Sequence, residues 1–303
     1  MVADAKLARV MDRFSEKVKE GEYYEAHQTL RTVANRYVRG KKWPEAIDLI
    51  THGIHTFIGV GQSSSAVDLI RYLLEVYEQG NVECTEANAG RLVKILVGLD
   101  LEEPDLREVC TGMNNWSVRH GRYTYGDPYL HSVIGRRLLE AGYLAEAERY
   151  FVLGTRESLE EYVNWMWEWY QQLEKPEAVG EFLSRLVFGY LGVGNLKYAY
   201  DACERFLARY IEHAAPKHER VEKGYAALYL FEGNPDLNFL QLLLIACQAG
   251  KPEFLTSLKS QYPQQAEQHE QALEHLGREF FNVTPKRQVP LLQDLMADFF
   301  NGA

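Results

Sequence analysis

The chain has 303 residues, of which 46% are apolar and 12% aromatic, and its formal net charge is −10. This apolar content suffices for one large core or for an elongated core built by stacking. The acidic balance argues against a dominant role in nucleic-acid binding, because nucleic-acid-binding domains usually carry a basic surface. No run of 18 uncharged apolar residues occurs, so we expect no membrane-spanning helix and no direct insertion into a membrane.

The cysteines and the first residues favour a cytosolic protein. Cys84, Cys110, Cys203 and Cys247 lie far apart and form neither a CxxC pair nor a zinc-binding pattern. We interpret them as small apolar residues of a protein kept in a reducing compartment. The starting segment, MVADAKLARVMDRF, lacks the apolar block of a signal peptide, which fits the same compartment.

Apolar residues recur at helical spacing through the first 80 residues and predict four helices. The apolar stripe of the first comprises Leu7, Val10, Met11, Phe14 and Val18. The second runs from Tyr23 to about Arg39 and is expected to bury Tyr24, His27, Leu30, Ala34 and Tyr37. The third begins at Pro44, which suits the first helical position, and carries Ile47, Ile50, Ile54 and Phe57. The fourth begins near Ser63, a good N-cap, and carries Val67, Ile70, Leu74 and Tyr77.

These helices repeat with a fixed period. Ala26, Ala46 and Ala66 are spaced by 20 residues, so a helix begins about every 20 residues and a helix pair recurs about every 40. A helix pair of this kind cannot bury its own apolar face and must stack on its neighbours. The pattern predicts an all-α fold: a right-handed superhelical α-solenoid of stacked antiparallel helix pairs, similar to tetratricopeptide repeats. Odd-numbered helices are expected to line one long face and even-numbered helices the other.

The same pattern of turns and helices continues to the C-terminal part of the chain. The exception is a weak strand over residues 225 to 231 (YAALYLF), followed by the turn-rich residues 232 to 235 (EGNP), which we expect to close a short β-hairpin. No low-complexity linker interrupts the chain, and we therefore expect no internal domain boundary.

The sequence offers little that indicates catalysis, a cofactor or a metal. His52 and His55 lie three residues apart on a helix, but no third ligand with useful spacing follows. The histidines of HEQALEH (269 to 275) are six residues apart, and the glycines of GYLGVGN (189 to 195) lie between two helices and form a turn. The cluster of Trp165, Trp167 and Trp169 is typical of core packing. We expect no enzyme; an enzyme hidden in a helical fold is an alternative that needs convergent polar groups in a pocket.

Two surfaces are candidates for binding another protein. Polar residues oppose the apolar stripe on the second helix (Gln28, Thr32, Asn35, Arg39) and on the fourth (Ser64, Asp68, Arg71, Glu75, Glu78). Both helices are even-numbered, so the two stripes are expected side by side, as a mixed-charge patch suited to a charged partner or as a plain solvated face. The last 24 residues are unusually apolar, and they either cap the solenoid or are covered by another chain.

Four segments resemble one known family. They are GEYYEAHQTLRTVANRYVRGKKWPEAIDLI, GQSSSAVDLIRYLLEVYE, DLNFLQLLLIACQAGK and LGREFFNVTPKRQ. Together they resemble the Golgi-to-ER traffic protein 4 family, the 35-kDa subunit class of the transmembrane-domain recognition complex. Residues 100 to 225 are similar mainly in length and helix pattern.

The resemblance implies a non-catalytic, cytosolic adaptor in the post-translational targeting of tail-anchored membrane proteins to the endoplasmic reticulum. In this family the N-terminal half, residues 1–150 here, docks a targeting ATPase in its nucleotide-bound form. The C-terminal half, residues 151–303 here, binds a small ubiquitin-like protein with the help of a β-hairpin. The complex thereby links a tetratricopeptide co-chaperone, which holds the client, to the ATPase that receives it. No cofactor is implied.

The family's binding surfaces transfer to particular positions of this chain. The implied ATPase contacts are Tyr23, Arg36, Arg39, Asp68, Arg71 and Glu75. The implied contacts with the ubiquitin-like protein are Tyr225, Leu228, Leu230, Phe231, Leu237, Phe239 and Leu240. The competing interpretation is a helical scaffold subunit of another assembly, such as a proteasome-lid-like complex. Such subunits usually end in a winged-helix module with strands, and we predict none after residue 232.

Overall fold

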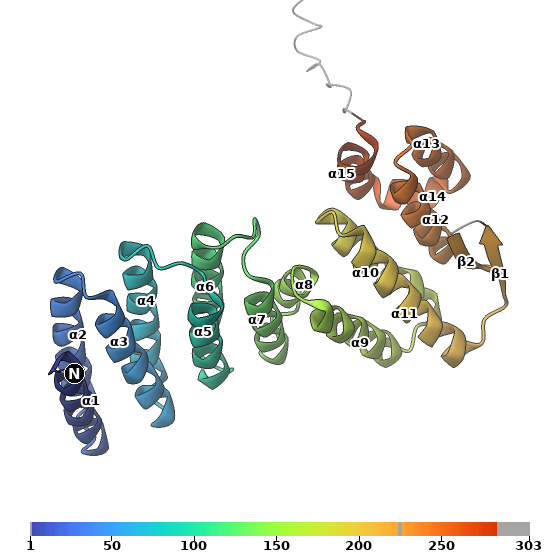
Figure 1. The fold of residues 1–303 in the computed structure, drawn as a ribbon. Coiled ribbons are helices and arrows are strands. Elements are labelled where there is room, and N and C mark those ends of the chain that lie inside the picture. Colours follow the sequence, from blue (N-terminus) through green and yellow to red (C-terminus); the bar gives the residue numbers. More distant parts are fainter. Residues whose placement is uncertain (1, 224–225, 284–303) are drawn as a thin grey trace, which may run out of the picture. The chain divides into compact units, whose positions relative to one another are not determined.

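The structure, a computed structural model, describes residues 2–223 and 226–283 and divides into two compact units, 1–162 and 163–303. The helices of the first unit are α1 Val2–Lys19, α2 Tyr23–Arg39, α3 Trp43–Gly59, α4 Ser63–Gln79, α5 Glu86–Gly98, α6 Leu106–His120, α7 Pro128–Glu140 and α8 Leu144–Val152, and α9 Arg156–Leu173 continues into the second. The second unit holds the 3-10 helix η1 Pro176–Ala178, α10 Val179–Gly192, α11 Leu196–Ala214, β1 His218–Lys223, β2 Ala226–Phe231, α12 Pro235–Ala249, α13 Pro252–Gln261, α14 Pro263–Gln268 and α15 Glu270–Phe281. The all-α fold class and its one short hairpin are confirmed over the described residues (Figure 1).

The first unit is built from two rows of helices (Figure 1). Helices α1, α3, α5 and α7 contact one another in succession, and consecutive helices such as α2 and α3 or α3 and α4 pack as pairs. Ion pairs connect the even-numbered helices of the other row. They join Arg31 of α2 to Asp68 of α4, Arg71 of α4 to Glu108 of α6, and Arg107 of α6 to Glu146 of α8. Odd-numbered and even-numbered helices therefore line separate faces, as the periodicity predicts.

The 20-residue period arises from one repeated turn. Gly21, Lys41, Gly61 and Asn81 all adopt a positive φ, between 46° and 80°, and each follows the end of a helix. This left-handed conformation costs a glycine little, whereas an L-residue with a side chain is strained there. Soon after three of these turns, Ala26, Ala46 and Ala66 are fully buried, where neighbouring helices approach closely. The turn and the small residue together set the spacing of the helices.

Most of the predicted apolar stripes form the core, with two corrections. Leu30 and Ala34 of α2 are buried, as are Ile47, Ile50, Ile54 and Phe57 of α3. Tyr24 was expected inside but is 77% exposed, because Ala26 occupies the closest contact of α2 instead. Ser63 is the first residue of α4, and Gln62 holds the N-cap position without a side-chain hydrogen bond.

The core of the second unit is rich in aromatic rings. Trp167 packs edge-on against Phe206, and Tyr170 contacts Phe182 and Tyr210. Trp167 is buried, whereas Trp165 and Trp169 are half-buried and stack on each other with their ring planes 10° apart. Packing accounts for all three tryptophans, as the sequence indicates.

The hairpin forms differently from the sequence prediction. β2 pairs antiparallel with the preceding strand β1, with His218 opposite Phe231 and Lys223 opposite Ala226. The turn-rich residues 232–235 lead into α12 and do not close the hairpin. β1 escaped prediction because its sequence, HERVEK, is charged and has a single β-branched residue, which is atypical of a strand.

Candidate functional site

The even-numbered face of the first unit carries ion pairs between successive helices. Arg31 Nη1 donates to Asp68 Oδ2 at 2.6 Å, and the same oxygen lies 2.8 Å from His27 Nε2. One turn further along, the Tyr72 hydroxyl donates to Asn35 Oδ1 at 2.7 Å. Asp68 is therefore engaged within the chain, so a basic partner group has to compete with Arg31 for its carboxylate.

Arg71 is engaged as well. Its Nε and Nη2 donate to the two carboxylate oxygens of Glu108 at 2.9 Å each, and Nη2 lies 3.0 Å from Asp105 Oδ2. The Glu108 hydrogen bonds raise the pKa of Arg71, and the same guanidinium lowers the pKa of Glu108. This two-pronged geometry fixes the Arg71 side chain across α4 and α6.

The remaining predicted ATPase contacts lie at the surface. Arg36, Arg39 and Glu75 are exposed, and none of them has an ion pair within the described part of the chain. Tyr23, at the start of α2, is half-buried. Arg36 and Arg39 occupy the last turn of α2, and Lys41 and Lys42 follow directly. The end of α2 is thus a cluster of cations available to a carboxylate-bearing partner.

The second candidate surface is the hairpin, which two side chains attach to α12. Gln241 accepts from the Tyr229 backbone N–H and donates to the Tyr229 carbonyl, both at 2.8 Å. Asn238 does the same for Phe231, at 2.9 and 3.0 Å. These amides bond to the backbone N–H and C=O groups of alternate residues, on the edge of β2 that faces away from β1. A neighbouring strand would bond to the same groups. We call Asn238 and Gln241 the amide clip.

A cavity of about 250 Å³ opens between α11, the hairpin and α12. Its lining includes Leu207, Leu228, Tyr229, Leu244 and Ile245. Glu204, Arg220, Gln241 and Gln248 add polar groups to the lining. A cavity that combines apolar walls with a few polar groups is a usual form of binding site.

The structure places the predicted hairpin residues in three different environments. Leu228 lines the cavity, Leu230 is 38% exposed, and Phe231 is buried. Leu237, Phe239 and Leu240 are at most 1% exposed; they form the core under α12, which corrects the expectation that they line an open groove. Tyr225 lies outside the described residues.

The described residues contain no cluster of three His, Cys, Asp or Glu side chains that could hold a metal ion. His52, one of the candidate pair, lies 3.0 Å from Ser15 Oγ, and burial lowers the pKa of both His52 and His55. The four cysteines are free thiols, and burial raises the pKa of Cys203 and Cys247 to about 12. In the part of the chain that the structure describes, no helix is long and apolar enough to cross a membrane.

Comparison with known proteins identifies the family. The family model for Golgi to ER traffic protein 4 matches residues 40–300. The chain belongs to this family. Golgi to ER traffic protein 4 of Aspergillus fumigatus is 30% identical, over 98% of this chain and 91% of that protein. The Schizosaccharomyces pombe protein of the same name is also 30% identical, over 99% of this chain and 96% of that protein.

A solved structure agrees with this assignment. The crystal structure of C. therm. Get4 matches with a TM-score of 0.87 and 31% sequence identity, covering 97% of this chain and 96% of that chain. The resemblance that the sequence motifs indicate is therefore confirmed, and so is the fold it implies.

Proposed function

We propose that this protein is a non-catalytic cytosolic adaptor in the targeting of tail-anchored membrane proteins to the endoplasmic reticulum. The even-numbered face of the first unit docks a targeting ATPase in its nucleotide-bound form. The hairpin and α12 dock a small ubiquitin-like protein, through which a tetratricopeptide co-chaperone and its client are reached. The observation that carries the proposal is the family match across residues 40–300.

The charged residues of the even-numbered face fall into two groups, one that connects neighbouring helices and one that is available to a partner. Arg31, Asp68, Arg71 and Glu108 pair within the chain and brace neighbouring helices. Arg36, Arg39 and Glu75 are exposed and free of ion pairs within the described residues, so they bear the contacts with the ATPase. Such exposed charges govern the rate and register of association more than the affinity itself.

The first experiment measures binding of the ATPase, with and without ATP, to the full chain and to Arg39→Glu and Glu75→Lys variants. Each reversal places like charges in contact with the partner, and we expect both to weaken ATP-dependent binding at least tenfold. Lys197→Glu, an exposed reversal on α11 of the second unit, is the matched control. Full-strength binding by both variants would place the ATPase elsewhere, and failure of the wild type to bind both with and without ATP would refute the adaptor function.

The second experiment tests the other half of the bridge. Leu228→Glu places a carboxylate in the cavity beside the hairpin, and we expect it to abolish binding of the ubiquitin-like protein while ATPase binding persists. Ser260→Glu, which introduces the same carboxylate at an exposed position of α13 outside the cavity, is the control. In a pull-down on immobilised ubiquitin-like protein, the wild-type chain should retain the ATPase. A variant with either the even-numbered face or the hairpin surface disrupted should not retain it.

A further inference from the structure

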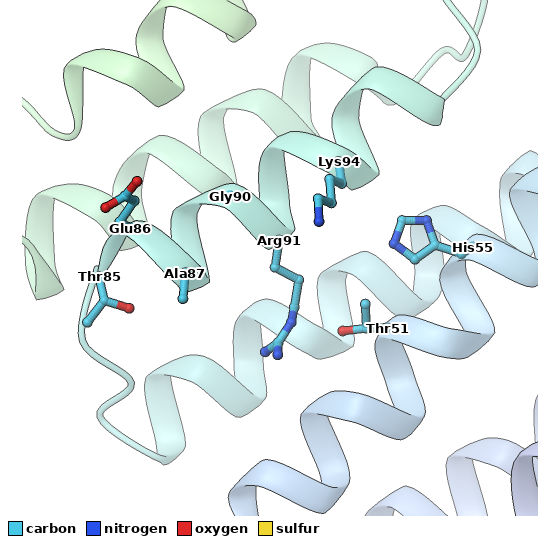
Figure 2. A pocket seen from close by; sticks show the side chains of 8 residues that line it. All are labelled: Thr51, His55, Thr85, Glu86, Ala87, Gly90, Arg91 and Lys94. Carbon is cyan, nitrogen blue, oxygen red and sulfur yellow. The ribbon is translucent and has the colours of Figure 1, made fainter. Parts of the chain in front are cut away.

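Two hollows on the first unit meet over α5. One, of about 800 Å³, lies between α3 and α5 (Figure 2). The other, of about 840 Å³, lies beside α5 and the segment that joins α6 to α7. Thr85, Glu86 and Gly90 line both, so the two hollows form one groove that crosses α5 near its N-terminal end. We call it the α5 groove.

The fold itself does not require a glycine at position 90. Side-chain or backbone atoms stand within 3.4 Å of the place a Cβ would take at Gly112, Gly135 and Gly180, so those helical glycines permit close packing. Nothing lies within 4 Å of the same place at Gly90, and its backbone has ordinary helical geometry. A glycine inside a helix is less stable than alanine. Its presence where the two hollows meet leaves room for a chain to pass over α5.

The hollow between α3 and α5 is lined by cations. Arg91 and Lys94 reach into it from α5 and His55 from α3, as Figure 2 shows. Arg91 forms an ion pair with Asp48, with 3.2 Å between Nη2 and Oδ1, whereas Lys94 is exposed and has no ion pair within the described residues. The buried Oγ1 of Thr51, which also lines this hollow, has no hydrogen-bond partner there. This end of the groove suits a carboxylate.

The other hollow carries more carboxylates than cations. Glu83, Glu86 and Asp127 line it together with Arg122, whose guanidinium stacks on the Tyr123 ring at 4.8 Å. Tyr129 is 58% exposed at its edge. Burial, together with the charges of Asp127 and Glu83, raises the pKa of Cys84, which also lines this hollow, to about 11. Carboxylates beside exposed aromatic faces are the usual surroundings of a bound lysine or arginine side chain.

We propose that the α5 groove binds an extended segment of a partner protein, whose backbone crosses α5 at Gly90. An acidic side chain of the segment points to Lys94 and Arg91, and a basic side chain points to Tyr129 and to the exposed carboxylates of Glu83 and Glu86. The excess of carboxylates in the second hollow would repel a nucleic acid or another uniformly anionic ligand. The two hollows together exceed the usual size of a small-molecule site, about 300–1,000 Å³, which favours a peptide chain.

The probe is a phage library of random twelve-residue peptides, selected on the full chain. Enriched peptides are synthesised with a fluorescein label, and their affinities are measured by fluorescence anisotropy. Gly90→Gln fills the crossing point with a residue of good helix propensity, so the variant keeps its fold. Val97→Gln introduces the same side chain two turns later, at an exposed position outside both hollows, and is the control.

We expect enriched peptides that carry an acidic and a basic residue several positions apart. Their binding should weaken at least tenfold with Gly90→Gln and less than twofold with Val97→Gln. Lys94→Glu should weaken binding, and a peptide with lysine in place of its acidic residue should restore it. The proposal is overturned if no peptide is enriched, or if the enriched peptides bind Gly90→Gln as tightly as the wild type. This test is independent of the ATPase and of the ubiquitin-like protein.

Discussion

Replacing Gln241 with leucine should release the hairpin without unfolding the second unit. Gln241 is 6% exposed, and its amide makes two hydrogen bonds of 2.8 Å with the backbone of Tyr229. Leucine has nearly the same volume, so no cavity forms, but the N–H and the carbonyl of Tyr229 lose their partners. The third bond, from Gln241 Nε2 to the Leu237 carbonyl, leaves no orphan, because that carbonyl also accepts within α12.

The expected size of the effect follows from these contacts. A hydrogen bond contributes about 0.5–1.5 kcal/mol net. Two lost bonds should therefore lower the free energy of opening the hairpin by about 2 kcal/mol, which is roughly a 30-fold change in an equilibrium constant. Hydrogen exchange measured by mass spectrometry should be about 30-fold faster over residues 227–231 in Gln241→Leu, by the same arithmetic.

The control variant is Gln248→Leu, on the same helix. Gln248 is exposed and accepts one bond, from the Tyr200 hydroxyl at 2.8 Å. Its loss should change exchange over residues 227–231 less than about twofold, as is usual for a surface substitution. Unchanged exchange in Gln241→Leu, or equal acceleration throughout α12, would refute the conclusion that the amide clip holds the hairpin locally.

Three further predictions concern the first unit. Gly90→Ala should stabilise the first unit by about 0.5–1 kcal/mol. Gly53→Ala should destabilise it by about 1–3 kcal/mol, because a Cβ at position 53 would lie 3.0 Å from Leu69 and still closer to Leu30. Thermal melting should show an increase in melting temperature for the first variant and a decrease for the second. Burial lowers the pKa of His131 below the 6.5 of a free side chain, so the unfolded chain takes up the proton first and stability should fall as the pH drops below about 6.5. The melting temperature should decline less steeply between pH 7.5 and 5.5 in His131→Gln. With its pKa raised to about 11, Cys84 should react with iodoacetamide at pH 8 about a hundredfold more slowly than an exposed cysteine, and Glu83→Gln should accelerate that reaction.

The helical repeat could be predicted because local sequence determines it. The positive-φ turns at Gly21 and Gly61 and the buried alanines that follow them are properties of short segments. They give the period, the class of fold and, within a residue, the beginnings of α2, α3 and α4. The misplacement of Tyr24 has a physical reason too: helical spacing allowed Tyr24 or Ala26 at the contact, and only the small residue fits a close approach.

The attachment of the hairpin could not be predicted in the same way. Asn238 and Gln241 belong to no recognisable sequence motif. Their amides form hydrogen bonds with the backbone of β2, and contacts with the backbone leave no pattern in the sequence. In a helix rich in apolar residues such as α12, a glutamine that is almost fully buried is nevertheless a signal. It needs hydrogen-bond partners inside the protein, and a neighbouring strand edge supplies them.

The intrachain pairs of the even-numbered face decide which substitutions test binding. The two residues of each pair are 37 positions apart: Arg31 and Asp68, Asn35 and Tyr72, and Arg71 and Glu108. A regular repeat brings such positions together, and a sequence read helix by helix does not show it. Asp68→Lys would place a second cation beside Arg31 and remove the carboxylate that lies against His27, and it would disturb the contact between α2 and α4. Arg39 carries no such contact among the described residues, so reversal of its charge reports on a partner, whereas reversal at Asp68 reports first on the fold.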